Sequence, residues 1–376
     1  MRATIAGYGS VSAAGGTPSE SSDTYRRGHA RWKLDGTTGL PIFPTGQLPD
    51  RPEIEAFCAA RAADPAGRLA LHAAEQAVRR AGWQDEDFSI LVGCSRGPTT
   101  AWEATYEEFR REGKPAMRTS PQTTLGSLAF VLADYFGSTE VASGMSVTCS
   151  SGHHAILHGL ALLHAGVTDR VLVGGAEAPL TPFTLRQMEE LRVYAHAQAG
   201  DAYPVRPFSQ PATGMALGEG AAFLALTLPD AEGELQLDGI GFARERHRSP
   251  TGISRTGEAL QLSMRAAIRE ANRGPEVILA HAPGTKRGDR AEVAAIREIF
   301  GPSGPSTGTF KWATGHTFGA SGPLATTAAL AMLEAGGEYW PAPYADASQP
   351  AGPVGTVLIN STGFGGNAIS IFVSRR

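Results

Sequence analysis

The segment at residues 146–158, SVTCSSGHHAILH, gathers residue types that could do chemistry. Cys149 stands where a short β-rich run at 146–149 ends and an apolar helix predicted over 150–165 begins. At the first turn of a helix, unpaired backbone N–H groups and the helix dipole would stabilise a thiolate. Taken alone, Cys149 is more simply explained as a small buried hydrophobe, because free cysteine is among the most buried residue types.

Three histidines, His153, His154 and His158, follow the cysteine. His154 and His158 are four residues apart and could share one face of a helix, as metal ligands do. The stretch holds no carboxylate, however, and it lacks the HExxH pattern. We therefore predict no metal site here, and we expect these histidines to pack and to form hydrogen bonds within the helix.

Two distant histidines change this assessment of the cysteine. His281 follows the apolar run VILA, a predicted strand over 277–282, and enters a Pro-Gly turn. His316 lies among glycine and alanine in KWATGHTFGASG (311–322), where backbone segments can approach closely. Each alone could be a structural loop histidine, but together with Cys149 they offer a nucleophile and two imidazoles.

The elements around these residues alternate between strands and helices. Residues 23–65 contain many turn formers and are predicted to be irregular. Helices are predicted at 66–81, 101–112, 123–136, 150–165, 258–271, 291–300 and 319–335, and strands at 4–11, 88–95, 146–149, 170–178, 221–229, 235–245, 277–282, 356–362 and 368–375. This alternation predicts an α/β protein with mixed sheets covered by helices. The rhythm occurs twice, so we expect two similar halves, residues 1–230 and 231–376, that share an interface.

Composition bounds the class of protein. The chain has 376 residues and a net charge of −4, which gives no reason to expect nucleic acid or an anionic membrane as a partner. Its three cysteines, Cys58, Cys94 and Cys149, form no CxxC pair, so neither a disulfide framework nor a thiolate zinc site is predicted. A reducing, cytoplasmic setting fits this usage. We find no secretion signal at the N-terminus and no apolar run long enough to span a bilayer.

In their order along the chain, several segments resemble the elongating β-ketoacyl-[acyl-carrier-protein] synthases, which have the thiolase-like fold. HAPGTKRGDRAE (281–292) is similar to the family's HGTGT–GD–E motif, KWATGHTFGASG to K–GHTxGAAG, and NSTGFGG (360–366) to NSFGFGG. The remaining matches are TIAGYGSVSAAG, CSSGHHAILH, VLVGGAEA and GMALGEGAA. The resemblance covers nearly the whole chain. It implies a layered α-β-α-β-α arrangement, with the nucleophile in the N-terminal half and the two histidines in the C-terminal half.

The resemblance also implies a mechanism and its main residues. Cys149 would take an acyl chain as a thioester, and His281 and His316 would stabilise the enolate formed when a malonyl thioester loses CO₂. Lys311, one of only four lysines, would support the site electrostatically. The enzyme would bind no cofactor or metal of its own, because both substrates would be carried on the phosphopantetheine of an acyl carrier protein.

Four further residues fall on family positions. Asp289 and Glu292 would hold water, loop backbone or Lys311, and Thr285 is the threonine kept from HGTGT. Phe364 would gate the acyl pocket, and its backbone N–H, with that of Cys149, would form the oxyanion hole.

This chain departs from the family pattern at several positions. Pro283 replaces a threonine whose hydroxyl, in the family, helps bind the carrier arm or the malonyl group. Thr362 replaces one of two gating aromatic residues, and RPFSQPATG (206–214) lacks the aspartate and second arginine of the usual PFDxxRxG turn. These changes bear on substrate handling more than on condensation, and they favour a specialised secondary-metabolite synthase over the housekeeping enzyme.

Several protein classes compete as explanations. The chain could be a homodimeric condensing enzyme, or a condensing subunit that works only with a related, chain-length-setting partner. A degradative thiolase commonly has a second cysteine near the C-terminal glycine-rich motif, and INSTGFGGNAIS has none. A non-catalytic carrier-binding protein is the fourth possibility. Arg206 matches a position that can meet the carrier in similar enzymes, although it could equally be a strut for its own turn.

Overall fold

The computed structural model describes residues 1–230, 233–246, 252–345 and 349–376. Its main sheet consists of two sets of five strands. The first set has the order β1-β8-β6-β4-β5, formed by β1 (Ala3–Ser12), β8 (Gly220–Thr227), β6 (Arg170–Glu177), β4 (Ser89–Gly93) and β5 (Ala142–Met145). The second set has the order β9-β13-β12-β10-β11, formed by β9 (Leu235–Arg244), β13 (Asn367–Arg375), β12 (Thr356–Gly363), β10 (Val277–Leu279) and β11 (Ser306–Gly308).

The two sets have the same topology. In the first, β8 is antiparallel to both β1 and β6, while β4 is parallel to β6 and β5. In the second, β13 is antiparallel to both β9 and β12, while β10 is parallel to β12 and β11. A short ladder, in which Ala3 faces Leu237 and Thr4 faces Gln236, joins β1 to β9. The predicted α/β class with two similar mixed-sheet halves is therefore confirmed.

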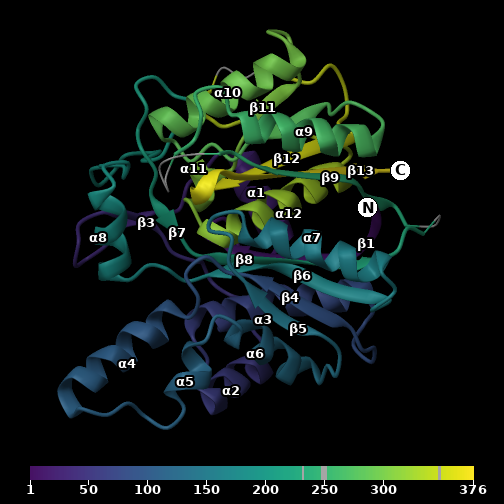
Figure 1. Ribbon diagram of the computed structural model, residues 1–376. Coiled ribbons are helices and arrows are strands. Elements are labelled where there is room, and N and C mark those ends of the chain that lie inside the picture. Colours follow the sequence, from purple (N-terminus) through teal and green to yellow (C-terminus); the bar gives the residue numbers. More distant parts are fainter. Residues whose placement is uncertain (231–232, 247–251, 346–348) are drawn as a thin grey trace.

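Helices form the layers between and outside the two sets of strands (Figure 1). Helices α7 (Ser151–His164) and α12 (Ser321–Glu334) lie between the two sets of strands, and α12 contacts strands of both sets. On the outer faces, α9 (Glu258–Ala271) and α10 (Lys286–Phe300) cover the second set, while α3 (Pro65–Ala81) and α6 (Ser127–Phe136) cover the first. Helix α12 is buried almost all round, as a central layer requires.

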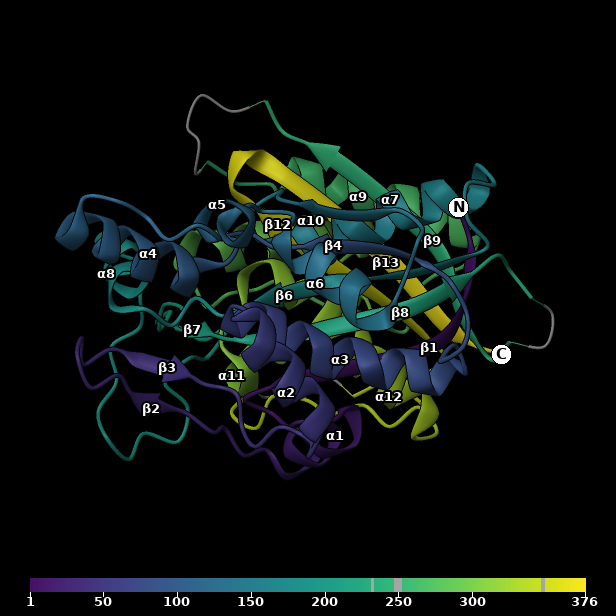
Figure 2. The ribbon, with the colours of Figure 1, turned by 90° about the horizontal axis from the view of Figure 1, so that it is seen from below.

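The remaining elements gather mainly at one end of the molecule. Figure 2 shows the small sheet of β2, β3 and β7, with α4 and α8, opposite the end where both termini lie. Their bounds are β2 (Lys33–Leu34), β3 (Pro41–Phe43), β7 (Leu217–Gly218), α4 (Thr99–Glu112) and α8 (Pro182–Glu190), and the other short elements are α1 (Pro18–Arg27), α2 (Pro52–Arg61), α5 (Thr119–Thr123), α11 (Lys311–Thr314), η1 (Phe318–Ala320) and η2 (Phe364–Gly366). None of the described helices has the length and apolar character needed to cross a membrane.

Three local predictions are wrong. Residues 23–65 are not simply irregular, because they contain the second half of α1 and all of α2. Each of these helices has proline near its start, where the missing N–H does no harm. The strand predicted at 146–149 lies instead at 142–145 as β5, since Thr148 has φ +52° and cannot continue a strand. The helix predicted from 291 begins at Lys286. The expected boundary after residue 230 borders residues 231–232, which lie outside the described residues.

Candidate active site

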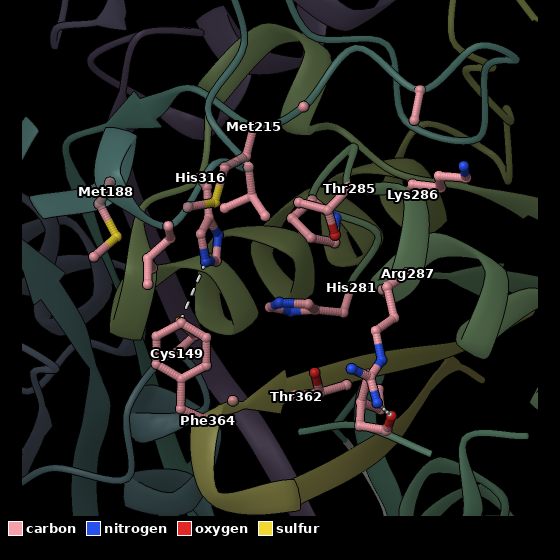
Figure 3. A pocket seen from close by; sticks show the side chains of 18 of the residues that line it. Cys149, Met188, Met215, His281, Thr285, Lys286, Arg287, His316, Thr362 and Phe364 are labelled. Carbon is pink, nitrogen blue, oxygen red and sulfur yellow. Dashed lines mark hydrogen bonds between the residues drawn. The ribbon is translucent and has the colours of Figure 1, made fainter. Parts of the chain in front are cut away.

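A cavity of about 580 Å³ lies where the two halves meet, and it brings together residues that are far apart in the sequence (Figure 3). Cys149 comes from the turn before α7, His281 from the loop after β10, and His316 from the segment between α11 and η1. Thr285 and Phe364 line the same cavity, as do Pro283 and Thr362, two of the departures from the family pattern.

The turn that carries Cys149 is held by the two serines after it. Thr148 takes a left-handed conformation, with φ +52°, and so reverses the chain just after β5. Ser150 Oγ donates to Val147 O at 2.8 Å, and Ser151 Oγ accepts from Val147 N at 2.9 Å. Helix α7 begins at Ser151, so Cys149 precedes the helix instead of occupying its first turn. The side chain is almost fully buried.

The two histidines predicted to work with the cysteine lie beside it. His316 Nε2 is 3.2 Å from Cys149 Sγ. The rings of His281 and His316 stand 5.2 Å apart between centroids and nearly perpendicular, at 89°. Both imidazoles therefore border the space in front of the sulfur, as Figure 3 shows. Among the described residues, no group of three or more His, Cys, Asp or Glu side chains is arranged to hold a metal ion.

Glu292 holds the loop that carries His281. Its carboxylate accepts from the backbone N–H groups of His281 and Ala282, at 2.9 and 2.8 Å, and from Asn360 Nδ2 at 3.1 Å. One turn earlier on α10, Asp289 accepts from Gly284 N at 3.1 Å and thereby fixes the next part of that loop.

Asp289 also links the loop to the segment of Arg206, through a bond from Phe208 N at 2.8 Å. Arg206 itself is exposed and is absent from the residues that line the cavity. Its backbone N–H donates to Thr213 Oγ1 at 2.9 Å, which ties down the two ends of the turn.

Lys311 lies buried behind the histidines. Its Nζ donates to the backbone carbonyl of His281, so it acts on the same loop as Glu292. Burial lowers the pKa of Lys311 to about 8, and the negative charge of Glu292 partly opposes this shift. The amine is therefore mostly protonated near neutral pH, and its positive charge acts on the Cys149 thiol.

The resting site is electrically neutral at its reactive atoms. Burial, followed by the nearby charge of Glu177, raises the pKa of Cys149 to about 12, although Lys311 acts in the opposite direction. Burial also holds the pKa values of His281 and His316 well below their usual range. The position before the helix therefore does not lower the pKa of this thiol as expected, because loss of water outweighs the backbone dipoles.

The end of β12 approaches the Cys149 turn closely. A Cβ atom placed on Gly363 would lie 2.0 Å from Thr148 Oγ1 and 3.1 Å from Cys149 N, so only glycine fits without displacing the turn. This contact brings the next residue, Phe364, to the cavity beside the cysteine, where its side chain is 39% exposed. Thr148 Oγ1 also donates to Phe364 O at 3.4 Å.

Sequence reasoning missed two residues of this site. Glu177, at the end of β6, accepts from Gly319 N at 3.1 Å and from Ser95 N, and so holds the segment after His316. Ser321 Oγ is 3.2 Å from His316 Nδ1. The available signals were a carboxylate at the end of the buried strand VLVGGAEA and a serine where K–GHTxGAAG has alanine.

A duplicated α/β fold in which a buried cysteine faces two histidines is the arrangement of thiolase-like condensing enzymes, acyltransferases that form carbon–carbon bonds. The chain belongs to the β-ketoacyl synthase family. Residues 55–231 match the family model for the beta-ketoacyl synthase N-terminal domain, and residues 236–338 match that for the C-terminal domain.

Proteins of similar sequence support this family assignment. Nodulation protein E of Rhizobium leguminosarum bv. trifolii is 28% identical over 325 residues, which are 81% of this chain and 77% of that protein. The tetracenomycin polyketide synthase ketoacyl synthase alpha subunit of Streptomyces glaucescens is 28% identical over 301 residues, covering 73% of this chain and 70% of that protein.

Solved structures show the same fold over the whole chain. A ketosynthase solved in complex with its chain length factor, from Xenorhabdus doucetiae, has a TM-score of 0.83 at 22% identity and covers 100% of this chain and 98% of its own. A complex between a type II polyketide synthase acyl carrier protein and its ketosynthase, bound to the hexaketide, contains a chain with a TM-score of 0.84 at 20% identity, covering 100% of this chain and 99% of its own. These likenesses confirm the predicted thiolase-like fold.

Proposed function

We propose that this protein is the condensing subunit of a polyketide-type synthase, and that it extends an acyl chain held on Cys149 by two carbons. The observation that carries the proposal is the contact of 3.2 Å between Cys149 Sγ and His316 Nε2, with His281 bordering the same cavity. A cysteine in this setting can form a thioester, and two neutral imidazoles can donate hydrogen bonds to a developing oxyanion.

In the first step, Cys149 sulfur attacks the thioester carbonyl of an acyl group on the carrier. The carbon–sulfur bond to the carrier breaks, and the departing carrier thiolate takes the proton that Cys149 gives up. The backbone N–H groups of Cys149 and Phe364 stabilise the tetrahedral oxyanion. The close approach of Gly363, the residue before Phe364, to Cys149 N supports this role.

In the second step, a malonyl thioester loses CO₂ and the electron pair forms an enolate. His281 and His316 donate N–H hydrogen bonds to the enolate oxygen. The enolate carbon attacks the Cys149 thioester and expels the cysteine thiolate, which takes a proton from water. The product is a β-ketoacyl group on the carrier, and neither step requires a redox or metal cofactor.

The surrounding residues position this chemistry. Lys311 and Glu292 fix His281 through its backbone, and Asp289 fixes the loop that leads to Thr285. Thr285 lines the cavity at the start of α10, where its hydroxyl is available to a bound carrier arm. Phe364, partly exposed at the cavity, serves as the gate for the acyl chain.

The expected partners are an acyl carrier protein and a second chain of the same fold. The tetracenomycin relative is an alpha subunit, and the structural neighbours include a ketosynthase with its chain length factor and one with a carrier protein. We propose the heterodimer over the homodimer on this basis, with Arg206 as a docking contact for the acidic carrier and phosphopantetheine as its bound arm. The three free cysteines fit a cytoplasmic location.

Intact-protein mass spectrometry with acyl-loaded carriers tests the proposal. The wild-type protein should gain the mass of the acyl group, Cys149→Ala should not, and Cys58→Ala, which removes another buried cysteine, should still gain it. His281→Ala and His316→Ala should spare acylation more than condensation. An acyl adduct on Cys149→Ala, or full condensation by both histidine variants, would show that the roles are wrong.

Condensation assays with and without a related chain separate the partner hypotheses. If condensation requires co-expression with a related chain that lacks the nucleophile, the protein is the condensing subunit of a heterodimer. If the purified chain condenses alone, it is a homodimeric enzyme. Cleavage of acetoacetyl-CoA by free CoA would point to a thiolase, and an unreactive Cys149 to a carrier-binding protein.

A further inference from the structure

His316 rests on a buried hydroxyl cluster at the start of α12, formed by Ser321 and Thr317. Ser321 Oγ is 3.2 Å from His316 Nδ1 and 3.0 Å from Thr317 Oγ1, and it accepts from Thr317 N at 3.0 Å. All three residues are buried, so bulk water does not complete their hydrogen bonds. The hydrogens in the cluster must therefore be shared among its own atoms.

Only two arrangements of these hydrogens are possible when His316 is neutral. A serine hydroxyl has one hydrogen and two lone pairs, and one lone pair already accepts from Thr317 N. In the first arrangement, Thr317 Oγ1 donates to Ser321 Oγ and Ser321 donates to His316 Nδ1. In the second, His316 Nδ1–H donates to Ser321 and Ser321 donates to Thr317 Oγ1.

The second arrangement leaves a buried hydroxyl hydrogen unpaired. Within the described residues, Ser321 is the only hydrogen-bond partner of Thr317 Oγ1, and Thr317 is fully buried. If Ser321 donated to Thr317 Oγ1, the hydrogen of the Thr317 hydroxyl would have no acceptor, and an unsatisfied buried donor is destabilising. The first arrangement satisfies every group of the hydroxyl cluster. It places the ring proton of His316 on Nε2, which then donates to Cys149 Sγ.

We infer that Ser321 is a positioning residue that fixes the tautomer of His316. It makes Nε2 a hydrogen-bond donor toward the sulfur and toward any oxyanion that forms in the cavity. It also prevents neutral His316 from acting as a base toward the Cys149 thiol, because Nε2 already carries a proton. The motif that this segment resembles has alanine at the position of Ser321, so this hydrogen bond from the serine hydroxyl is a feature of this chain's own sequence.

Nitrogen NMR of the histidine rings tests the tautomer directly. In protein labelled with ¹⁵N-histidine, the two nitrogens of His316, assigned by their loss in His316→Ala, should resonate as unprotonated Nδ1 and protonated Nε2. In Ser321→Ala the donor to Nδ1 is gone, so both shifts should move toward a mixture of tautomers. Ser321→Thr keeps a hydroxyl and should restore the wild-type shifts.

A matched control is available on the same helix. Thr326 Oγ1 lies 3.0 Å from Nε2 of His153, a buried histidine outside the Cys149 pair. Thr326→Val removes that hydroxyl while keeping the side-chain shape, and it should leave the ring shifts of His316 unchanged. A shift of His316 in Ser321→Ala but not in Thr326→Val therefore reports the local bond and not a general change in packing.

The kinetic arm rests on the proposed condensing function. Loss of one well-placed hydrogen bond predicts about a tenfold fall in condensation rate for Ser321→Ala, with acylation of Cys149 less affected. A wild-type spectrum with the proton on Nδ1 would overturn the inference whether or not the variants fold. Unchanged shifts and rates in Ser321→Ala would overturn it too. Absence of condensation in the wild-type protein would count against the function instead, because the tautomer is read independently.

Discussion

The contact between Gly363 and the Cys149 turn makes a sharp prediction about Gly363→Ala. The glycine has φ −151° and ψ 171°, an extended conformation that any residue adopts, so alanine introduces no backbone strain. Its Cβ, however, would lie 2.0 Å from Thr148 Oγ1, 3.1 Å from Cys149 N and 3.2 Å from Val147 O. The threonine hydroxyl can rotate away, whereas the two backbone atoms must move by a few tenths of an ångström.

This geometry sets the expected magnitude. One extra methyl group in a packed site typically costs about 1–3 kcal/mol. A displacement of about 1 Å at a reacting group can cost about a hundredfold in rate, so a shift of a few tenths predicts about a tenfold slower acylation of Cys149. The melting temperature should fall by only a few degrees, because the clash is confined to one turn.

The assay is the rate of acyl adduct formation and of alkylation by iodoacetamide, followed by mass spectrometry. Thr148→Ala removes the atom at 2.0 Å, so the double variant should recover much of the rate that Gly363→Ala loses. Gly355→Ala is the matched control, because its Cβ would meet only Glu276 Oε2 at 3.6 Å just before the same strand. Wild-type acylation by Gly363→Ala, or no recovery in the double variant, would refute the reasoning.

Three further predictions follow from the loop contacts and charges. Glu292→Gln places an amide N–H₂ group against one of the two backbone N–H groups that the carboxylate now binds, so stability should fall by about 1–3 kcal/mol in chemical denaturation. Condensation should fall more than alkylation of Cys149, and equal losses would contradict the assignment to the His281 loop. The pKa of Lys311 is lowered by burial to about 8, so between pH 8 and 10 the unfolded chain binds more protons at Lys311 than the folded chain does. As the pH rises through this range, the stability of the wild type should rise relative to Lys311→Met by up to about 1.4 kcal/mol per pH unit. A pH-independent difference in stability would argue against a buried charge. Arg206→Glu should raise KM for the acyl carrier without changing turnover of a small acyl thioester. Arg269→Glu, a charge reversal on α9, should change neither. An unchanged KM in Arg206→Glu would contradict the docking proposal.

Helices with a local signature could be predicted from the sequence. Helix α9 occupies residues 258–271 as predicted, because apolar residues recur at helical spacing. Helix α3 ends at Ala81, where Gly82 has φ +71°. The strand before Cys149 could not be placed, because the β-branched residues of SVTC outweighed the half-exposed residues of ASGM at the sheet edge.

The sequence motifs pointed to the residues of the site but not to the bonds that orient them. Cys149 and His316 are 167 residues apart, and only the fold brings them to 3.2 Å. The raised pKa of the thiol also depends on tertiary structure, since it follows from burial and from Glu177. The role of Ser321 was missed because a serine in a glycine-rich segment has no pattern of its own; its meaning comes from the atoms around its hydroxyl.

The uncharged cysteine and histidines suit a site that must stabilise the short-lived negative charge of an enolate. Burial keeps Cys149 and both histidines uncharged before substrate binds, so no fixed anion competes for the N–H donors. When CO₂ leaves, the enolate forms in surroundings of low dielectric, where a hydrogen bond to an anion is stronger than in water. Lys311, mostly protonated at neutral pH, then adds a positive charge behind the two rings. The burial that makes the free thiol hard to ionise therefore strengthens the stabilisation of the enolate.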